Sequence, residues 1–481
     1  MSYGKIFKRI EGSICAPRGF NASAVFCDIK RLGTGKGSEK GRKRDLALIV
    51  SDAPAAVAGM FTTNQICAAP VKLSASRAAK RFARAIVVNS GNANACTGRQ
   101  GMRDTETMAR LAASAIAPEL AGKVDGFKPS SFQKGYGEVT AEDVLVCSTG
   151  RIGVLMPMKN VERGIRACAP LLARSPRNAR EAAEAIMTTD TRRKEIGFEL
   201  KIGRSAARIG GICKGAGMIQ PGMAVATGLW PVGTTKRTAH RAMATGHATM
   251  LAFITTDVAI EPKLLKHALR IAVAQSFDRI TVDGDMSTND SVIMLANGLA
   301  GNPRIEKGQS GSDRNSRFRV FQAALNIVCL ELAKMIVRDG EGASRFVAVH
   351  IHGARNAAEA EAAARAIANS LLVKASWCGG DPNWGRILCA LGYSKAKVKE
   401  SLVDVGYAKP GSRKILFAFR RGRPTNLALK TLAKITTAPE FELHVDLHLG
   451  RADFTMYGSD LTEDYVAFNK GDVSDPASLG G

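Results

Sequence analysis

Three Ala-Thr pairs lie close together in the sequence, and each could supply a nucleophilic threonine. Thr227 lies in "PGMAVATGLWP", and Thr245 and Thr249 lie in "RAMATGHATMLAFITTD". A threonine hydroxyl is a weak nucleophile unless a base lies beside it, and cleavage of the chain before the threonine frees an α-amine that can act as that base. The pKa of an α-amine is about 7.7–8.0, close to cellular pH. The pairs therefore raise the hypothesis of a self-processing enzyme with an N-terminal threonine.

The surroundings of Thr249 suit this chemistry. Gly215 and Gly217 lie in the approach "CKGAGMIQPGM", and the strand-like run "TMLAFITTD" begins at Thr249 itself. A nucleophile needs this kind of tight approach and rigid support, because its reacting atoms must be held in alignment. An Ala-Thr pair at the start of a strand is nevertheless common and usually inert, so the pattern alone leaves the choice open.

Strands and helices alternate along most of the chain. Apolar residues three and four apart predict helices, and β-branched or alternating runs predict strands. The helices are expected over 103–117, 160–174, 261–277, 319–337 and 356–372, and the strands over 45–52, 84–91, 143–150, 197–203, 249–260, 345–353, 414–421, 441–448 and 452–459. This order predicts a mixed α/β fold with mixed sheets and layered helices. The length of 481 residues fits two to four domains or one large α/β body.

Three segments interrupt this alternation. Segments 122–139 and 302–316 are rich in Gly, Ser, Pro and charge, and are predicted to be exposed excursions. Segment 224–247 has neither helical nor strand period and lies directly before Ala248-Thr249. Its position makes it the segment that bears most on the chemistry.

The net charge of +25 raises the question of a nucleic-acid partner. The basic residues concentrate in loop or surface-helix contexts, and only 6% of the chain is aromatic, so a platform for stacking bases is not expected. No apolar stretch reaches the roughly 20 residues that cross a bilayer, and no secretory signal is expected at the start. We therefore expect a cytoplasmic protein with neither a nucleic-acid nor a membrane partner.

No metal site is expected from the residue pattern. The ten cysteines are scattered singly, which predicts buried free thiols rather than a disulfide framework or a metal cluster. Asp283, Asp285 and Asp290 do not have the full spacing of a Ca²⁺ loop. The seven histidines include two pairs on predicted strands, which we interpret as ordinary strand positions; they are His240, His247, His267, His350, His352, His444 and His448.

The residues around Thr249 carry a resemblance to a known family. "KGAGMIQPGM", followed later by "ATMLAFITTDVAI", resembles the self-cleavage motif of the ornithine acetyltransferase (glutamate N-acetyltransferase) family of arginine biosynthesis. The resemblance extends over most of the chain, through "APRGF", "DLALIVSDAPAAVAGMFTTN", "ARAIVVNSGNANACTG", "STGRIG", "AEAIMTTDT", "DRITVDGDMSTNDS", "IVRDGEGASRFV", "GGDPNWGRI" and "GSDLTEDYVAFN". So many long matches in one order make it specific.

The resemblance implies a precursor that cleaves itself into an α chain, 1–248, and a β chain, 249–481, with the two-chain fold of that family. Carried over by motif, the scissile bond is Ala248-Thr249 and the nucleophile is Thr249, because the family's threonine is followed directly by Met-Leu-Ala-Phe. Thr227 and Thr245 are each followed by glycine and do not match. The implied partners are the cleaved chains themselves, as αβ units that pair into a heterotetramer.

The implied reaction passes the acetyl group of N-acetylornithine to Thr249 and then to glutamate. Negative charge that develops on the acetyl oxygen requires preset donors, and the resemblance places this oxyanion hole at Thr149 and Gly150. Lys214 suits a carboxylate and Glu341 an amine, although both would also fit ordinary surface charges. The implied substrate contacts are Thr188, with Thr191 in reserve, and Lys214, Thr249, Glu341, Asn469 and Ser474; Ser474 is assigned mainly by spacing, because the tail departs from the family's ending.

The sequence departs from the family most clearly before the scissile bond. In typical members Pro-x-Met runs straight into Ala-Thr-Met-Leu, whereas here residues 224–247 intervene and His247 precedes Ala248. An insert relaxes the clamp that self-cleavage needs. The insert either bulges away while cleavage proceeds, which we favour, or leaves an uncleaved, inactive precursor; a mistaken gene model is the third explanation.

Two other functions stay open. One is an amidase or aminopeptidase that uses the same N-terminal threonine, and the other is a nucleic-acid-binding or moonlighting role suggested by the charge. No cofactor or metal is expected, and acetyl-CoA is an optional co-substrate if the enzyme is bifunctional.

Overall fold

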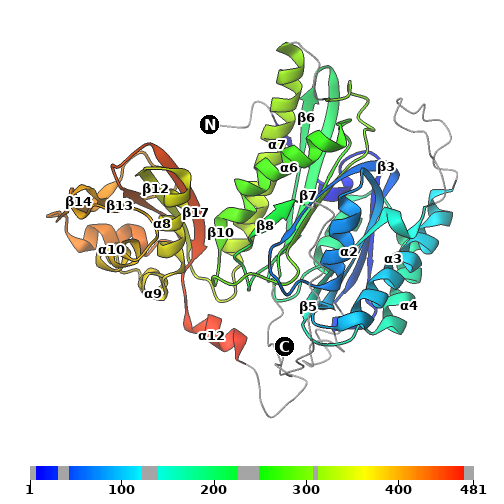
Figure 1. Cartoon of the computed structure of the whole chain (residues 1–481), viewed down its shortest axis with the longest axis horizontal. Coiled ribbons are helices and arrows are strands. Elements are labelled where there is room, and N and C mark those ends of the chain that lie inside the picture. Colours follow the sequence, from blue (N-terminus) through cyan, green and yellow to red (C-terminus); the bar gives the residue numbers. More distant parts are fainter. Residues whose placement is uncertain (1–6, 31–42, 122–138, 226–248, 307–311, 471–481) are drawn as a thin grey trace. The chain divides into compact units, whose positions relative to one another are not determined.

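Two compact units make up the chain in the computed structural model, which describes residues 7–30, 43–121, 139–225, 249–306 and 312–470 (Figure 1). The first unit comprises Met1–Asp278, Met286–Ala333 and Gly471–Gly481. The second comprises Arg279–Asp285 and Lys334–Lys470. Each unit contains one sheet and several helices, so the predicted mixed α/β class is confirmed. The expected division at 248/249 concerns a cut in the chain and stays a prediction.

The first unit is built on a ten-stranded mixed sheet. Its main path runs β1 (Lys8–Arg9), β6 (Lys194–Ile202), β7 (Ser205–Lys214), β9 (Leu251–Thr256), β11 (Ser291–Ala296), β3 (Leu46–Thr62), β4 (Phe82–Asn92) and β5 (Val144–Arg151), while β2 (Phe20–Val25) and β8 (Met223–Val225) pair with β3. The pairs β9–β11 and β4–β5 are parallel, and the other pairs are antiparallel.

Apolar side chains of this sheet are buried on both of its faces. Ile86 and Val88 of β4 belong to one hydrophobic cluster, and Ala85 and Val87 to another. Such two-sided burial explains why the strand "RAIVVNSG" is a continuous apolar run rather than an alternating one. The helices of this unit are α2 (Ala69–Ala78), α3 (Gly98–Leu120), α4 (Met158–Cys168), α5 (Pro176–Ala185), α6 (Pro262–Ala274) and the greater part of α7 (Ser312–Arg338).

The second unit has a seven-stranded sheet in the order β10 (Ile280–Thr281), β17 (Ala452–Ser459), β12 (Phe346–Ala354), β16 (Glu440–Asp446), β13 (Asp404–Ala408), β14 (Leu416–Arg420) and β15 (Arg423–Pro424). Its helices are α8 (Ala357–Asn369), α9 (Leu371–Cys378), α10 (Trp384–Gly392), α11 (Leu429–Thr436) and α12 (Glu463–Asn469). Val349 of β12 and Leu443 of β16 pack in the core with residues of α8 to α11, whereas their neighbours His350 and His444 are only partly buried. The core therefore lies on one face of this sheet.

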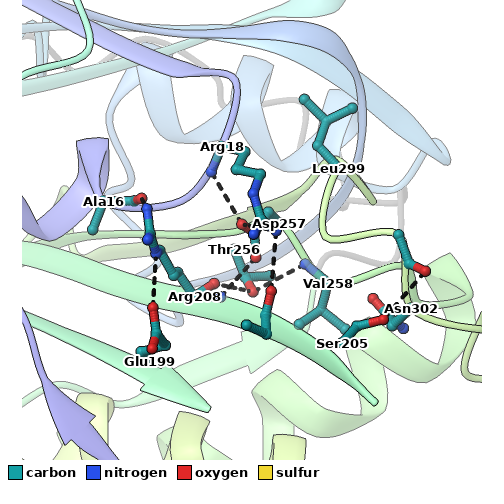
Figure 2. A network of polar contacts seen from close by, with 12 residues as sticks. Ala16, Arg18, Glu199, Ser205, Arg208, Thr256, Asp257, Val258, Leu299 and Asn302 are labelled. Atoms are coloured by element: carbon teal, nitrogen blue, oxygen red, sulfur yellow. Dashed lines mark hydrogen bonds and ion pairs between the residues drawn. The ribbon is translucent and has the colours of Figure 1, made fainter. Parts of the chain in front are cut away.

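Asp257 marks the end of β9 and ties three segments of the first unit together (Figure 2). Its buried carboxylate accepts the backbone N–H of Arg208 at 2.7 Å and that of Arg18 at 3.1 Å. Burial raises the pKa of the Asp257 carboxyl, although both N–H groups favour the carboxylate. The Asp257 side chain takes the Arg208 N–H of the neighbouring strand β7, and β9 stops at Thr256 instead of running to residue 260 as predicted.

The predicted strands and helices are otherwise present, with one large difference in extent. β3 was expected over 45–52 but continues to Thr62, through "DAPAAVAGMFT". Its pairing with β4 shifts register between Val50 and Ala55, around Pro54, which has no N–H for a ladder. The proline and alanines obscured the continuation, which the structure supports by pairing β3 with β2, β4, β8 and β11.

One helix and the cysteines complete the comparison with the sequence-based expectations. Residues Ser316–Arg338 of α7 are long and apolar enough to cross a membrane by length and composition, but Phe321, Leu325 and Leu332 are fully buried in the protein.

Seven cysteines are buried as expected; Cys378 is partly exposed, and Cys96 and Cys389 are exposed, which contradicts the expectation for those three. Residues 122–138, 226–248 and 307–311 lie outside the described residues. The second of these ranges contains most of the predicted insert, 224–247.

Candidate active site

Thr249 lies immediately before β9, where two neighbouring strands meet that strand. Leu251 at the start of β9 is opposite Lys214 at the end of β7 and opposite Ser291 at the start of β11. The threonine is only 2% exposed in the intact chain. Its hydroxyl contacts the segment that leads into β11.

The segment before β11 holds the Thr249 hydroxyl in place. Thr249 Oγ1 and Ser287 Oγ are hydrogen-bonded at 2.8 Å. Asp290 accepts the N–H of Met250 at 2.9 Å and the N–H of Ser287 at 3.2 Å, so one carboxylate holds Ser287 and the residue that follows Thr249. These two contacts engage both carboxylate oxygens, so Asp290 fixes the backbone on both sides of the Thr249–Ser287 hydrogen bond.

Sequence reasoning did not single out Ser287. The motif "TVDGDMSTND" pointed to a turn that shapes the pocket, but its members could not be ranked. The parallel pairing of β9 with β11 brings together the segments that precede the two strands, with Thr249 two residues before β9 and Ser287 four residues before β11. Such non-local pairing has no signal in the local sequence, apart from the polar residues that precede both apolar runs.

Thr149 and Gly150 lie near the end of β5, the strand that the sequence pattern predicted over 143–150. Gly150 has φ of +132°, and a Cβ at this position would come within 2.2 Å of the Gly91 carbonyl carbon on β4. A side chain is therefore excluded both by conformation and by space. Thr149 is fully buried, and its hydroxyl oxygen accepts a hydrogen bond from Lys214 Nζ at 3.3 Å. As an acceptor from Lys214, this hydroxyl keeps its own proton for donation.

Lys214 belongs to a buried charged cluster. Its ammonium donates to Thr188 Oγ1 at 2.7 Å and lies 3.7 Å from the Asp190 carboxylate, while Lys194 Nζ donates to the same carboxylate at 2.6 Å. Burial by itself raises the pKa of Asp190, but the ammonium groups of Lys194 and Lys214 outweigh it and hold that pKa well below its usual range. Lys214 is thus a buried cation balanced by Asp190, and not a surface charge.

Asn289 joins the Thr249 side of the site to the Thr149 side. Its side-chain amide donates to the carbonyl of Ser148, next to Thr149, at 2.8 Å, and to the carbonyl of Ala93 at 2.7 Å. Its backbone N–H donates to Ser287 Oγ at 3.1 Å. A chain of hydrogen bonds and one peptide unit therefore runs from Thr249 through Ser287 and Asn289 to Thr149 and Lys214.

The remaining predicted substrate residues divide among other parts of the chain. Thr188 contacts Lys214, whereas Thr191 is exposed, so the geometry favours Thr188 over its reserve. Glu341 and Asn469 belong to the second unit, where Asn469 Nδ2 donates to Glu341 Oε2 at 3.0 Å. Ala248 and Ser474 lie outside the described residues.

Glu341 lies in an acidic part of the second unit. It is 7% exposed, and burial together with Asp283 and Glu341 raises the pKa of the Tyr465 hydroxyl well above its usual value. A concentration of negative charge at this point suits an ammonium group. Within the first unit, the described residues bring together the Thr149 hydroxyl and the Lys214 ammonium, with Gly150 next to Thr149 in the chain.

Comparison with known proteins gives a consistent result. The profile of the ArgJ family matches residues 27–471. The chain is 43% identical over 462 residues to an arginine biosynthesis bifunctional protein ArgJ from Symbiobacterium thermophilum, covering 96% of this chain and 98% of that protein. It is 38% identical over 465 residues to a glutamate N-acetyltransferase from Methanocaldococcus jannaschii, with the same coverage.

A solved structure also matches part of the chain. The ornithine acetyltransferase from Mycobacterium tuberculosis, crystallised with ornithine, is 33% identical with a TM-score of 0.38, and the match covers 45% of this chain and 100% of that chain.

Proposed function

The chain belongs to the ArgJ family and is an acyltransferase of arginine biosynthesis, and on this premise we propose that it carries acetyl from N-acetylornithine to glutamate on Thr249. The observation that carries the proposal is the buried hydrogen-bonded network in which the Thr249 hydroxyl, the Thr149 hydroxyl and the Lys214 ammonium take part. This network combines a nucleophile with preset donors, which is what acyl transfer requires.

The first step makes the nucleophile. Hydrolysis of the Ala248-Thr249 bond consumes one water, leaves a carboxylate on Ala248 and frees the α-amine of Thr249. This amine takes the proton of the Oγ1 hydroxyl as that oxygen attacks the acetyl carbonyl carbon. The ornithine amine leaves with a proton, and the acetyl group stays on Thr249 as an ester. The amine of glutamate then attacks the ester carbonyl, which releases N-acetylglutamate and restores the hydroxyl and the free α-amine.

The surrounding residues act on geometry and charge. Ser287, held by Asp290, orients the Thr249 hydroxyl. The Thr149 hydroxyl and the Gly150 N–H would donate to the oxyanion, and loss of one such donor typically costs about 10²–10³ in kcat. The Lys214 ammonium raises the positive potential at Thr149, and its contact with Thr188 provides a place for a substrate carboxylate. Glu341 and Asn469 would recognise the amino end.

Intact-mass measurement of the purified protein tests the nucleophile and the cleavage together. We expect two fragments split at 248/249, the second beginning with Thr249, and a single uncut chain for Thr249→Ala. That variant should also lose acetyl transfer by about 10⁴-fold or more, as expected when a nucleophile is removed. Thr227→Ala and Thr245→Ala are matched controls that should cleave and react normally.

Several outcomes would count against the proposal. A wild-type chain that stays intact would identify an inactive precursor. A Thr249→Ala chain that still cleaves at 248/249 would show that Thr249 is not needed for the cleavage. Release of free acetate without N-acetylglutamate would favour the amidase or aminopeptidase alternative.

The wider setting follows from the same premise. We propose a cytoplasmic enzyme that acts on small molecules and assembles as αβ units paired into a heterotetramer. No resident cofactor is needed, because Thr249 itself carries the acetyl group. Acetyl-CoA would enter as a second acetyl donor if the enzyme is bifunctional, and a dependence of N-acetylglutamate formation on acetyl-CoA measures this directly.

A further inference from the structure

A group of histidines lies on the face of the second sheet opposite to its hydrophobic core. His350 and His352 of β12 point away from Val349 and Ile351, which belong to the core. On the neighbouring parallel strand β16, His444 is in register with His350. The two rings stack with centroids 4.6 Å apart. None of these residues takes part in the proposed acetyl transfer.

Glu442 completes a set of three groups that can ligate a metal ion. Glu442 Oε2 lies 3.3 Å from His444 Nε2 and 3.9 Å from His350 Nε2. One ligand atom from each residue lies within 4.8 Å of the others. Ligands bound at about 2.0–2.1 Å to a tetrahedral Zn²⁺ are themselves about 3.3–3.5 Å apart. The separation of 3.3 Å matches this spacing, and a bound ion would draw the wider separations of the set closer together.

His350 supplies an independent sign that a ligand belongs here. Its Nε2 atom is buried and has no hydrogen-bond partner among the described residues. Buried polar atoms are normally satisfied, and one that is not calls for an explanation. A metal ion between the histidines and Glu442 would satisfy it.

Each of the three side chains also makes a hydrogen bond through its other polar atom. His350 Nδ1 is hydrogen-bonded to Thr455 Oγ1 at 2.9 Å, and His444 Nδ1 to His352 Nε2 at 3.2 Å. Glu442 Oε1 accepts the backbone N–H of Gly411 at 2.8 Å, which leaves Oε2 to face the histidines. Outer partners of this kind orient metal ligands in known sites.

We propose that His350, His444 and Glu442 form a binding site for a divalent transition-metal ion of the Zn²⁺ or Co²⁺ kind. His352 is the outer partner that orients His444. Two imidazoles and one carboxylate select such ions over Mg²⁺ and Ca²⁺, which prefer oxygen ligands. The ligand side chains are 13–22% exposed, so water can take the fourth position.

This proposal revises the interpretation of these histidines as ordinary strand positions. The i, i+2 spacing of His350 and His352 has no metal signature by itself, and the sequence does not show that β12 pairs with β16. Lys334 brings a positive charge to the same face, where its ammonium lies 5.1 Å from the centre of the Tyr457 ring. The Glu442 carboxylate is what offsets the charge of an ion.

Cobalt titration of the full-length protein tests the site. After treatment with a chelator and dialysis, addition of CoCl2 should produce visible d–d absorption bands that saturate at one ion per chain and disappear on addition of ZnCl2. His350→Ala and His444→Ala should abolish the bands. His352→Ala should weaken Co²⁺ binding about 10–100-fold, as loss of an outer partner does in known sites.

Controls separate this site from other metal-binding groups. His267→Gln changes an exposed histidine of the first unit, and a His240→Gln/His247→Gln double variant removes two histidines outside the described residues; both should bind Co²⁺ like the wild type. If an alanine variant fails to fold by circular dichroism, Glu442→Gln provides the test and should weaken Co²⁺ binding at least about tenfold.

The proposal is overturned if the wild type shows no saturable Co²⁺ bands, or if folded His350→Ala and His444→Ala variants keep them. The site lies wholly within residues 350–444, so its binding does not depend on cleavage at 248/249. Its failure and that of the acetyltransferase proposal are therefore distinguishable.

Discussion

β9 of the first unit and β16 of the second bury their side chains in different ways. All six residues of β9 are buried, whereas the residues of β16 alternate between partly buried and buried. A strand covered on both faces has no polar face, so polar groups are expected beyond its ends, and Thr249 lies two residues before β9. A strand covered on one face can carry polar groups along its length, as β16 does with Glu442 and His444.

The two units also differ in how deeply the following charged groups are buried. Lys194, Lys214 and Asp190 are buried together with exposures of 0–1% for their side chains. Arg338 and Glu440 of the second unit form an ion pair with side chains 35% and 38% exposed. A charged cluster buried away from water cannot lose one member without leaving an uncompensated charge. In a solvent-exposed ion pair, water can replace a lost partner.

Loss of the Asp190 charge should have the largest effect. We expect Asp190→Asn to lower the free energy of unfolding by about 3–5 kcal/mol at pH 7, because two buried ammonium groups lose their counter-charge. Since the folded pKa of Asp190 lies below its ordinary value of 3.8, its contribution is complete above that pH and is lost as the pH falls below it. Denaturant unfolding of the wild type and of Asp190→Asn should therefore show a difference in the free energy of unfolding that narrows below about pH 4. A difference that stays constant with pH would assign the effect to packing alone.

Alanine substitutions along each strand test the difference in burial. Phe253→Ala and Ile254→Ala, at adjacent positions of β9, should each destabilise the protein by about 2–5 kcal/mol, because both side chains are fully buried. In β16, Leu443→Ala should cost a similar amount. Thermal unfolding measures all three variants. A tolerated Ile254→Ala would show that β9 has one packed face only.

The smallest effect is expected on the exposed side of β16. Arg338 donates two hydrogen bonds to Glu440, and these lower the pKa of that carboxyl. Glu440→Gln should lower the free energy of unfolding by less than about 1 kcal/mol, because solvent screens the pair. This contribution is present above the ordinary glutamate pKa of 4.5 and declines below it, so the variant and the wild type should converge in acid. A loss comparable to that of Asp190→Asn would contradict the comparison.

The sequence predicted much of the fold, for identifiable reasons. Two-sided burial makes strands such as β4 continuous apolar runs, and one-sided burial makes β16 alternate, so both were recognisable. In the first unit, β2, β7 and β11 were not predicted from the sequence. β3 was recognised only in part, because Pro54 and a register shift interrupt its pattern. Exposure of Cys96 and Cys389 was missed, because a single residue type does not report how its surroundings pack.

The sequence by itself predicted the mixed α/β class and many of the strands and helices, because these depend on residues that are neighbours in the chain. Its family motif selects Thr249 among the three Ala-Thr pairs as the proposed nucleophile. Only the tertiary structure decided that Ser287 holds the Thr249 hydroxyl, that Asp190 neutralises Lys214, and that His350 meets His444. These contacts join residues far apart in the sequence through sheet pairing and register. Register is set by the packing of whole sheets, which no local pattern contains.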